Sequence, residues 1–518
     1  MNKIWRGLAL TLVVCAAMAS ARDLVILHTN DTHSHVEAEN GIGGVLQRKA
    51  LIDSVRRAEK NVLLIDAGDI VQGTLYFKLF GGQVEYPLMD MMGYDVQIIG
   101  NHELDNGLDE LARYYKRKGA AKLSANYDFS DTPLKGVFDP YIIRKIDGRK
   151  VGIMGLNLDP DGIVSPQNYR GVKYSDIIGT ANATAAKLRS LGCELVIAVT
   201  HIGYSDDSGA GRTTDVDLAK ASKGIDIIIS GHSHELVSPD TPERPNVFSN
   251  ADGKPVLVEQ TGRYGANLGY IKVDLDGGKP VVEEARMIPV VGQNSAKFDK
   301  KIERFIAPYT HIVDSINARR IAVCDVSMRN TKQYATSVLL SNFTADAVQQ
   351  YAVSVADSIS LPGGVDLTVV NSGGIRLPMD KGAITEGQIL STYPFTNYVE
   401  IVTMPGSALT EVLSQAALQK GQAVSEGVWI GLNEAGDKVE SILVNGQPVD
   451  PAAQYNVATL DYLALGGDYL SAFKQARSVW KDSKELCAPM MRYVVDLGRA
   501  GIPVNPDPRP RIVTVKRF

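Results

Sequence analysis

Five short segments in the first half of the chain carry the side chains that most often bind metal ions. Each segment directly follows a run of apolar residues and contributes carboxylate, amide or imidazole groups, and most contain a glycine that permits a tight turn. The segments are His28-Thr29-Asn30-Asp31-Thr32-His33, Asp66-Ala67-Gly68-Asp69, Gly100-Asn101-His102-Glu103-Leu104-Asp105, Thr200-His201 and Ser230-Gly231-His232-Ser233-His234. One such histidine alone would be an ordinary core residue, but a pattern repeated after five apolar runs indicates a shared metal site.

The ligand types predict which metals this site would hold and what they would do. Nitrogen and oxygen donors without a thiolate suit Zn, Mn, Fe or Co. Two divalent cations facing the carboxylates of Asp31 and Asp69 would leave a net positive charge, which can bind a hydroxide and an anionic phosphate. A two-metal centre lowers the pKa of its water to about 7 and clamps an in-line displacement at phosphorus. We therefore expect two divalent metal ions and a phosphoester substrate.

The apolar runs themselves predict a layered α/β domain. From Asp23 to about Glu284 they are rich in Val, Ile and Leu, as is typical of strands buried on both faces, and helical patterns alternate with them, for example at residues 44–58 and 181–191. The predicted strands are residues 24–27, 62–65, 96–99, 151–156, 195–199 and 227–229. Because ligands bind at the carboxyl ends of strands in α/β sheets, the polar segments can converge there.

The five motifs, in this order, resemble those of the calcineurin-like metallophosphoesterases, and most closely those of the bacterial 5′-nucleotidase/UDP-sugar hydrolase family. The resemblance implies a four-layer αββα sandwich. It also implies that one metal is held by Asp31, His33 and His234, that the other is held by Asn101, His201 and His232, and that Asp69 bridges both. His102 and Asp105 would form a catalytic dyad. The alternative is that His102 only caps a turn and Asp105 begins a helix.

A long helix is predicted to divide the chain. Apolar residues recur at steps of three and four from Lys297 to Ala322 and form one stripe, with Pro308 as a point of kinking. This helix could be one more core element, but strand and helix patterns restart after it, which favours a connection between domains. We expect a signal peptide at residues 1–21, a metallophosphoesterase domain at 22–295, a linker helix at 296–330 and an α/β substrate-binding domain at 331–518.

The second domain contains a pattern that could recognise the substrate. A predicted strand at residues 365–370 runs into Asn371-Ser372-Gly373-Gly374-Ile375-Arg376, where exposed backbone N–H groups beside a guanidinium would bind an anion. An ordinary glycine turn is the alternative. The family resemblance implies that Asn371 and Arg376 contact the substrate, that Phe395 and Tyr462 stack on the nucleobase, and that Asp468 binds the nucleoside. The chain departs from the family at Tyr462, where Phe is common, and at Tyr469, where Gly is usual.

The N-terminus and the overall charge bear on location and partners. Lys3 and Arg6, the apolar residues 8–17 and Ala19-Ser20-Ala21 form the pattern of a cleaved signal peptide, with a retained anchor as the alternative. A net charge of −5 argues against duplex nucleic acid as a partner. We expect a periplasmic or secreted protein with no stable membrane anchor, as a monomer or weak dimer. Cys193, Cys324 and Cys487 could form at most one disulfide, and the pairing stays open.

These observations predict an exported dinuclear metal phosphohydrolase that removes phosphate from nucleotides, in the manner of a 5′-nucleotidase. A hinge near the linker helix would bring the metal site and the nucleoside clamp together. Three alternatives use the same scaffold: a UDP-sugar hydrolase, a 2′,3′-cyclic-nucleotide phosphodiesterase with 3′-nucleotidase activity, and a thiosulfohydrolase. A surface binding protein without activity is a further alternative, which the complete set of metal-binding side chains disfavours.

Overall fold

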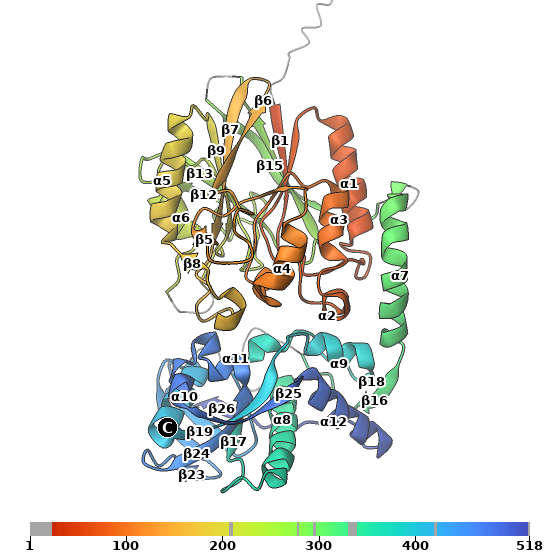
Figure 1. Cartoon of the computed structure of the whole chain (residues 1–518), viewed down its shortest axis with the longest axis vertical. Coiled ribbons are helices and arrows are strands. Elements are labelled where there is room, and N and C mark those ends of the chain that lie inside the picture. Colours follow the sequence, from red (N-terminus) through yellow and green to blue (C-terminus); the bar gives the residue numbers. More distant parts are fainter. Residues whose placement is uncertain are drawn as a thin grey trace, which may run out of the picture.

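The computed structural model describes residues 23–206, 211–276, 279–293, 297–329, 339–418 and 422–515. The predicted signal peptide lies outside the described residues. The chain forms two lobes, one above the other in Figure 1, and the long helix α7 (Lys300–Asn317) runs along one side and connects them. Among the described residues, no helix combines the length and the apolar character needed to span a bilayer.

Two sheets packed face to face form the middle of the N-terminal lobe. The first has the order β15-β14-β1-β2-β3-β4, and the second has the order β11-β13-β10-β9-β7-β6, with β12 paired to β13. Leu24 and Ile26 of the first sheet share a buried cluster with Ile153 and Ile197 of the second. The strands are β1 (Asp23–Thr29), β2 (Val62–Asp66), β3 (Val96–Gln97), β4 (Ala121–Lys122), β6 (Tyr141–Ile146), β7 (Arg149–Asn157), β9 (Leu195–His201), β10 (Ile227–Ile229), β11 (Leu236–Val237), β12 (Val247–Ser249), β13 (Pro255–Thr261), β14 (Asn267–Asp274) and β15 (Val281–Pro289).

Helices cover the outer face of each sheet. Helices α1 (Val45–Ala58) and α3 (Glu85–Met92) pack on the first sheet, and α5 (Ile177–Ser190) and α6 (Asp215–Ala221) pack on the second (Figure 1). This is the four-layer αββα arrangement that the motif resemblance implied. Shorter elements fill the lower edge of the lobe: α2 (Leu75–Phe80), η1 (His102–Leu104), α4 (Gly107–Tyr115), β5 (Tyr127–Asp128), η2 (Pro166–Tyr169) and β8 (Lys173–Tyr174).

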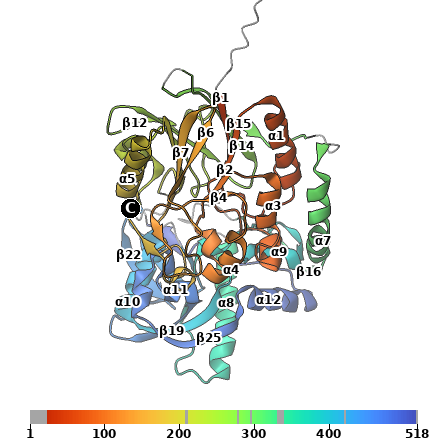
Figure 2. The same ribbon diagram turned by 45° about the horizontal axis from the view of Figure 1, so that its top comes forward.

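The predicted linker helix is present but shorter than its apolar stripe suggested. It begins at Lys300, where the Asp299 side chain accepts hydrogen bonds from the N–H groups of Lys301 and Ile302. It ends at Asn317, and β16 (Arg320–Cys324) follows where the prediction had helix up to residue 322. Ile302, Ile306 and Val313 face the core of the N-terminal lobe, so one face of the helix packs against that lobe. Its lower end lies beside α9 (Glu386–Thr392) of the other lobe (Figures 1 and 2).

The C-terminal lobe is built on a five-stranded sheet of order β20-β17-β24-β19-β25. Helices α8 (Leu339–Ser358) and α12 (Cys487–Arg499) cover one face, and α10 (Gly406–Leu418) covers the other. The sheets of this lobe contain β16 with β18 (Gly382–Thr385), β17 (Leu367–Val370), β19 (Tyr398–Pro405), β20 (Ala423–Val424), β21 (Val428–Leu432), β22 (Val439–Val444), β23 (Gln447–Pro448), β24 (Gln454–Leu460), β25 (Arg477–Glu485) and β26 (Ile512–Thr514). Short helical turns are α11 (Asp461–Ala464), η4 (Ser372–Gly374), η5 (Gly467–Tyr469) and η6 (Ser471–Gln475).

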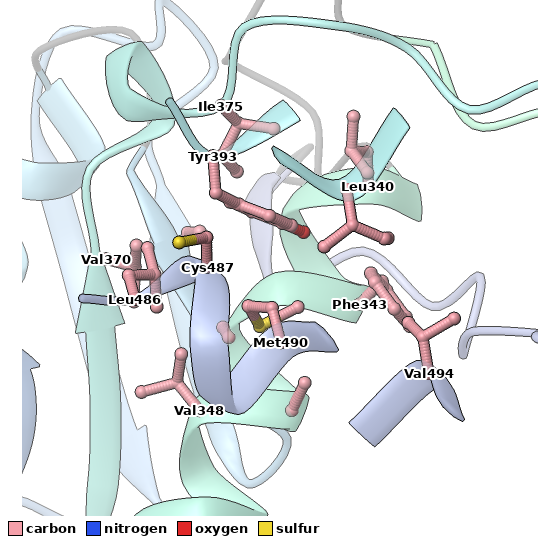
Figure 3. Close-up of a cluster of buried hydrophobic side chains, with 14 of the residues drawn as sticks. Leu340, Phe343, Val348, Val370, Ile375, Tyr393, Leu486, Cys487, Met490 and Val494 are labelled. Atoms are coloured by element: carbon pink, nitrogen blue, oxygen red, sulfur yellow. The ribbon is translucent and has the colours of Figure 1, made fainter. Parts of the chain in front are cut away.

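Figure 3 shows the core between α8, α12 and the sheet of this lobe. Tyr393 lies inside it at 1% exposure, and its hydroxyl is 2.8 Å from Thr344 Oγ1, so the buried polar atom is satisfied. Cys487 and Cys324 line the same core, whereas Cys193 lies in the other lobe. All three cysteines are buried free thiols, so none of the disulfide pairings left open by the sequence forms.

Replacing Leu340 by alanine is expected to lower the free energy of unfolding of the C-terminal lobe by about 2–5 kcal/mol, because the change leaves a cavity in this core. Leu340 is 1% exposed, whereas Leu418, the control position, is 44% exposed. Leu418→Ala should change the same free energy by about 0.5 kcal/mol or less. Urea denaturation followed by circular dichroism measures both, and equal effects would contradict the assignment of the core.

Candidate metal centre and substrate cavity

The seven predicted metal ligands lie together at the carboxyl ends of strands from both sheets of the N-terminal lobe. Asp31 and His33 follow β1, Asp69 follows β2, Asn101 follows β3, His201 ends β9, and His232 and His234 follow β10. Their close approach requires unusual turns. Five of the seven residues have a positive φ, which side-chain-bearing residues rarely adopt: Asp31 (49°), His33 (46°), Asp69 (54°), His232 (85°) and His234 (62°). Such strain costs about 1–3 kcal/mol per residue and is concentrated at functional sites.

Asp31, His33 and His234 form the first of three groups whose ligand atoms all lie within 4.8 Å of one another. Asp31 Oδ1 is 3.7 Å from His33 Nε2 and 3.5 Å from His234 Nε2. His33 Nδ1 lies 3.1 Å from the carbonyl oxygen of Gln72 and therefore carries the proton, which directs the lone pair of Nε2 into the group. Burial, and then the neighbouring His234, lower the pKa of His33 well below its usual value, so His33 is held in the neutral form that binds metals.

Asp69, His201 and His232 form a second group on the other side. His201 Nδ1 donates to the carbonyl oxygen of Ala67 at 2.7 Å, which turns its Nε2 toward the other members of the group. This buried Nε2 is 3.1 Å from Asp69 Oδ2 but makes no hydrogen bond of proper geometry among the described residues. Asn101 joins the group through its Oδ1, which is 2.9 Å from His232 Nδ1. The four residues offer nitrogen and oxygen atoms that fit a divalent cation.

The charges of this second group also favour a cation. Burial opposes protonation of His201, but Asp69 and Asp31 together raise its pKa to about 10. Burial, and then His201, lower the pKa of His232 to about 3. The carboxylates thus attract positive charge to the centre, while the second imidazole stays neutral and able to coordinate.

Asp69 lies between the two groups. Its Oδ1 accepts a hydrogen bond of 2.9 Å from the backbone N–H of His102. Its Oδ2 is 3.1 Å from His201 Nε2 and 3.9 Å from His33 Nε2, which are nitrogens of different groups. This position is the one expected of a carboxylate shared by two metal ions.

The carboxyl groups of Glu103 and Asp215 hold the loops of the site in place. Glu103 accepts hydrogen bonds from the backbone N–H groups of Gly100 (2.5 Å), Asp69 (2.9 Å) and Ile70 (2.8 Å). Asp215 accepts from the hydroxyls of Thr200 (2.6 Å) and Ser230 (2.5 Å), which flank His201 and precede the His232 loop. Neither residue has a role predicted from the sequence. Glu103 belongs to a recognised motif and could have been found there, whereas nothing in the sequence around Asp215 indicates its contacts.

The predicted dyad is formed in the structure. His102 Nδ1 is 2.8 Å from Asp105 Oδ2, within one 3₁₀ turn, and Asn168 fixes the turn by donating to the backbone carbonyl of Asp105 at 2.7 Å. Helix α4 begins after Asn106, so Asp105 does not cap it, contrary to the alternative reading. Burial opposes protonation of His102, but Asp105 and then Asp69 raise its pKa above the usual value.

A cavity of about 550 Å³ opens beside the dyad and is lined by both lobes. All five predicted substrate residues of the C-terminal lobe line it, together with His102, Asp105 and Asn101 of the N-terminal lobe. The five are Asn371, Arg376, Phe395, Tyr462 and Asp468. The structure therefore brings the predicted catalytic and recognition residues to one cavity. These residues lie far apart in the sequence, since His102 and Arg376 are 274 positions apart.

The contacts inside this cavity connect the recognition residues to the metal side. The ring of Phe395 is 5.7 Å from the ring of His102, and the guanidinium of Arg376 lies 5.7 Å from the centre of the Phe395 ring. Asn371 Oδ1 is buried without a hydrogen-bond partner among the described residues and can accept from a ligand. Asn106, Gln167 and Asn168 line the same cavity, and they could not be predicted because isolated amides carry no pattern.

Comparison with known proteins agrees with both lobes. The calcineurin-like phosphoesterase family model matches residues 24–236, and the 5′-nucleotidase C-terminal domain model matches residues 318–475. The solved structure of a 5′-nucleotidase precursor from Thermus thermophilus has 27% identity and a TM-score of 0.81, and the match covers 96% of this chain and 100% of that one.

Two curated relatives are similar at the same level. Bovine 5′-nucleotidase is 28% identical over 88% of this chain and 85% of its own length. The trifunctional nucleotide phosphoesterase protein YfkN of Bacillus subtilis is 28% identical over 88% of this chain, which spans only 32% of that longer protein. The fold and these similarities together show that the chain joins a domain of the calcineurin-like phosphoesterase family to a domain of the 5′-nucleotidase C-terminal family, and that it is a metal-dependent phosphoester hydrolase.

Proposed function

We propose that this protein removes phosphate from nucleotides by means of two divalent metal ions and a nucleoside site in the C-terminal lobe. The observation that carries the proposal is the cavity that the His102–Asp105 pair shares with Arg376, Phe395 and Tyr462. A phosphate beside the dyad would leave the rest of a nucleotide within reach of the aromatic and polar residues of the other lobe. Aromatic stacking contributes about 1–3 kcal/mol per base and accepts any base.

Seven residues would hold the metals. Asp31, His33 and His234 would bind one ion, and Asn101, His201 and His232 the other, with Asp69 shared. The unpartnered Nε2 of His201 and the tautomers imposed by the carbonyl oxygens of Gln72 and Ala67 support this assignment. Bound there, the cations would supply positive charge to the phosphate and lower the pKa of the attacking water. The donor set suits Zn, Mn, Co or Fe.

The chain's own residues would bind and protonate the substrate. Arg376 would pair with phosphate oxygens, since a guanidinium matches their geometry with two hydrogen bonds. His102, held charged by Asp105, would stabilise negative charge or donate its Nε2 proton to the leaving oxygen. Asp468 and Asn371 would accept hydrogen bonds from the hydroxyls of the ribose.

A UDP-sugar is the second candidate substrate. Asn106, Gln167 and Asn168 line the same cavity as the dyad and offer neutral hydrogen-bonding groups, which suit the hydroxyls of a sugar attached to the phosphate. Export to the periplasm or the medium is part of the same proposal. It rests on the predicted signal peptide, and the Thermus relative is described as a precursor.

A substrate panel on metal-reconstituted enzyme tests the reaction. AMP is expected to be hydrolysed best among AMP, 3′-AMP, 2′,3′-cyclic AMP, UDP-glucose and ATP, and phosphate release measures each rate. Chelation with EDTA should abolish hydrolysis, and Zn, Mn, Co or Fe should restore it. A higher rate with UDP-glucose or with the cyclic nucleotide would instead indicate a UDP-sugar hydrolase or a 2′,3′-cyclic-nucleotide phosphodiesterase. Hydrolysis that persists after chelation would contradict the metal mechanism.

Asp69→Ala is expected to lower kcat/KM for AMP at least 1,000-fold (about 4 kcal/mol of transition-state stabilisation), because both proposed ions lose a shared ligand. The metal content, measured by inductively coupled plasma mass spectrometry, should fall in parallel. Asp252→Ala is the matched control, since Asp252 lies in an exposed turn. Unchanged activity in the Asp69 variant would contradict the assignment of Asp69 as a shared metal ligand.

Asp105→Asn is expected to shift the alkaline limb of the pH–rate profile to lower pH. Asp105 raises the pKa of His102, so its removal makes His102 lose its proton at a lower pH, and the charged form needed for catalysis disappears earlier. We expect kcat at pH 7 to fall about 100-fold, within the range of general acid catalysis. A profile with an unchanged alkaline limb would show that His102 is not the titrating group.

A further inference from the structure

We propose that Arg212 and Tyr469 are positioning residues for the nucleoside side of the cavity. They hold residues 159–163 of the N-terminal lobe against the part of the C-terminal lobe that carries Tyr462 and Asp468. The proposal rests on the proposed nucleotide substrate. Neither residue lines the cavity, and both act through residues that do.

Tyr469 has a backbone conformation that a tyrosine does not favour. Its φ is +58°, directly after Asp468 at +48°. A residue with a side chain is strained there, and glycine would adopt the same turn without strain. The strain indicates that contacts of the side chain hold this conformation.

The contacts of the Tyr469 side chain cross to the other lobe. Its ring packs over Gly162, where even one added carbon atom would lie 2.9 Å from the ring. Its hydroxyl accepts a hydrogen bond from Nε of Arg212, and the Arg212 guanidinium lies 5.3 Å from the ring centre. Gly162 and Arg212 both belong to the N-terminal lobe, so the strained residue connects the two lobes.

Arg212 extends this connection into the backbone of the 159–163 segment. Its Nη1 donates to the carbonyl oxygen of Asp159 at 2.5 Å, and its Nη2 donates to the carbonyl oxygen of Asp161. One guanidinium thus fixes two carbonyl groups of the segment and the Tyr469 hydroxyl at once. A lysine could not reproduce this fork.

The fixed segment in turn holds the recognition residues. The Tyr462 hydroxyl lies 3.0 Å from the carbonyl oxygen of Gly162 and 3.0 Å from Asp468 Oδ1. The backbone N–H of Asp468 also donates to the carbonyl oxygen of Gly162 at 3.0 Å. Ile163, Tyr462 and Asp468 all line the cavity. We expect loss of the Arg212–Tyr469 contact to release the segment against which these groups are set, and residues 159–163 of that segment contain none of the proposed metal ligands.

Two substrates separate this role from a general structural one. AMP uses both the phosphate and the nucleoside sides of the cavity, whereas 4-nitrophenyl phosphate has no ribose and needs only the phosphate side. For Tyr469→Gly and Arg212→Met, we expect the KM for AMP to rise at least tenfold with kcat changed less than threefold. The kcat/KM for 4-nitrophenyl phosphate should change less than twofold.

Stability provides an independent readout. Because glycine relieves the positive φ, Tyr469→Gly should unfold at the same temperature as the wild type or higher, even as its KM rises. Tyr469→Phe keeps the ring on Gly162 and loses only the hydroxyl. Its KM for AMP should therefore lie between the KM of the wild type and that of Tyr469→Gly. Arg286→Met is the matched control, because Arg286 lies 4.4 Å over Tyr270 within the N-terminal lobe, and its kinetics should equal those of the wild type.

The outcomes separate this proposal from the nucleotidase proposal. If wild-type enzyme hydrolyses 4-nitrophenyl phosphate but no nucleotide, the proposed function fails. Small-angle X-ray scattering then tests the contact between the lobes, with a larger radius of gyration for both variants supporting it and an unchanged radius overturning it. If AMP is hydrolysed and the KM of both variants equals that of the wild type, or if both substrates are affected equally, the positioning role is wrong.

Discussion

The burial of two aspartates among five imidazoles is the constraint on which the rest of the structure depends. Asp31 and His33 are fully buried, and Asp69 is 1% exposed, yet their polar atoms face one another instead of water. Buried charges are costly unless opposite charge compensates them. Divalent cations would supply that compensation, and backbone carbonyl groups hold His33 and His201 with their Nε2 atoms turned inward.

This constraint explains why the two sheets pack as they do. Asp31, Asp69 and Asn101 come from the first sheet, and His201 and His232 come from the second, so the distance between sheets sets the distance between ligands. The apolar cluster between the sheets fixes that distance. A polar pair lies near the site, in which His28 Nε2 of β1 is 3.1 Å from Glu259 Oε2 of β13. Both residues are completely buried, and the contact joins the two sheets at the edge from which the metal loops emerge.

Features of the site could be predicted from the sequence where a recurring motif marks them. Contacts between residues of different elements could not be predicted. Strands that end in polar motifs could be predicted, because each apolar run and its motif are contiguous in the chain, as for Asp69 after β2. The predicted strand at 96–99 became only β3 (Val96–Gln97), since the chain there leaves the sheet to bring Asn101 to the site. Asp215 and Arg212 could not be found, because their partners lie on other elements and no local pattern marks them.

The division of the site between two lobes places limits on how the lobes are joined. The N-terminal lobe carries the metal residues and the dyad, the C-terminal lobe carries the aromatic residues, and neither lobe alone encloses the cavity. The described contacts across the interface include polar pairs, such as Lys78 with Glu485 on one side and Arg212 with Tyr469 on the other. Pairs of this kind contribute about 1 kcal/mol or less each when partly exposed, so the arrangement of the lobes does not depend on any single pair. Because α7 packs into the core of the N-terminal lobe and also lies against α9 of the C-terminal lobe, any movement between the lobes would have to change the contacts between α7 and α9.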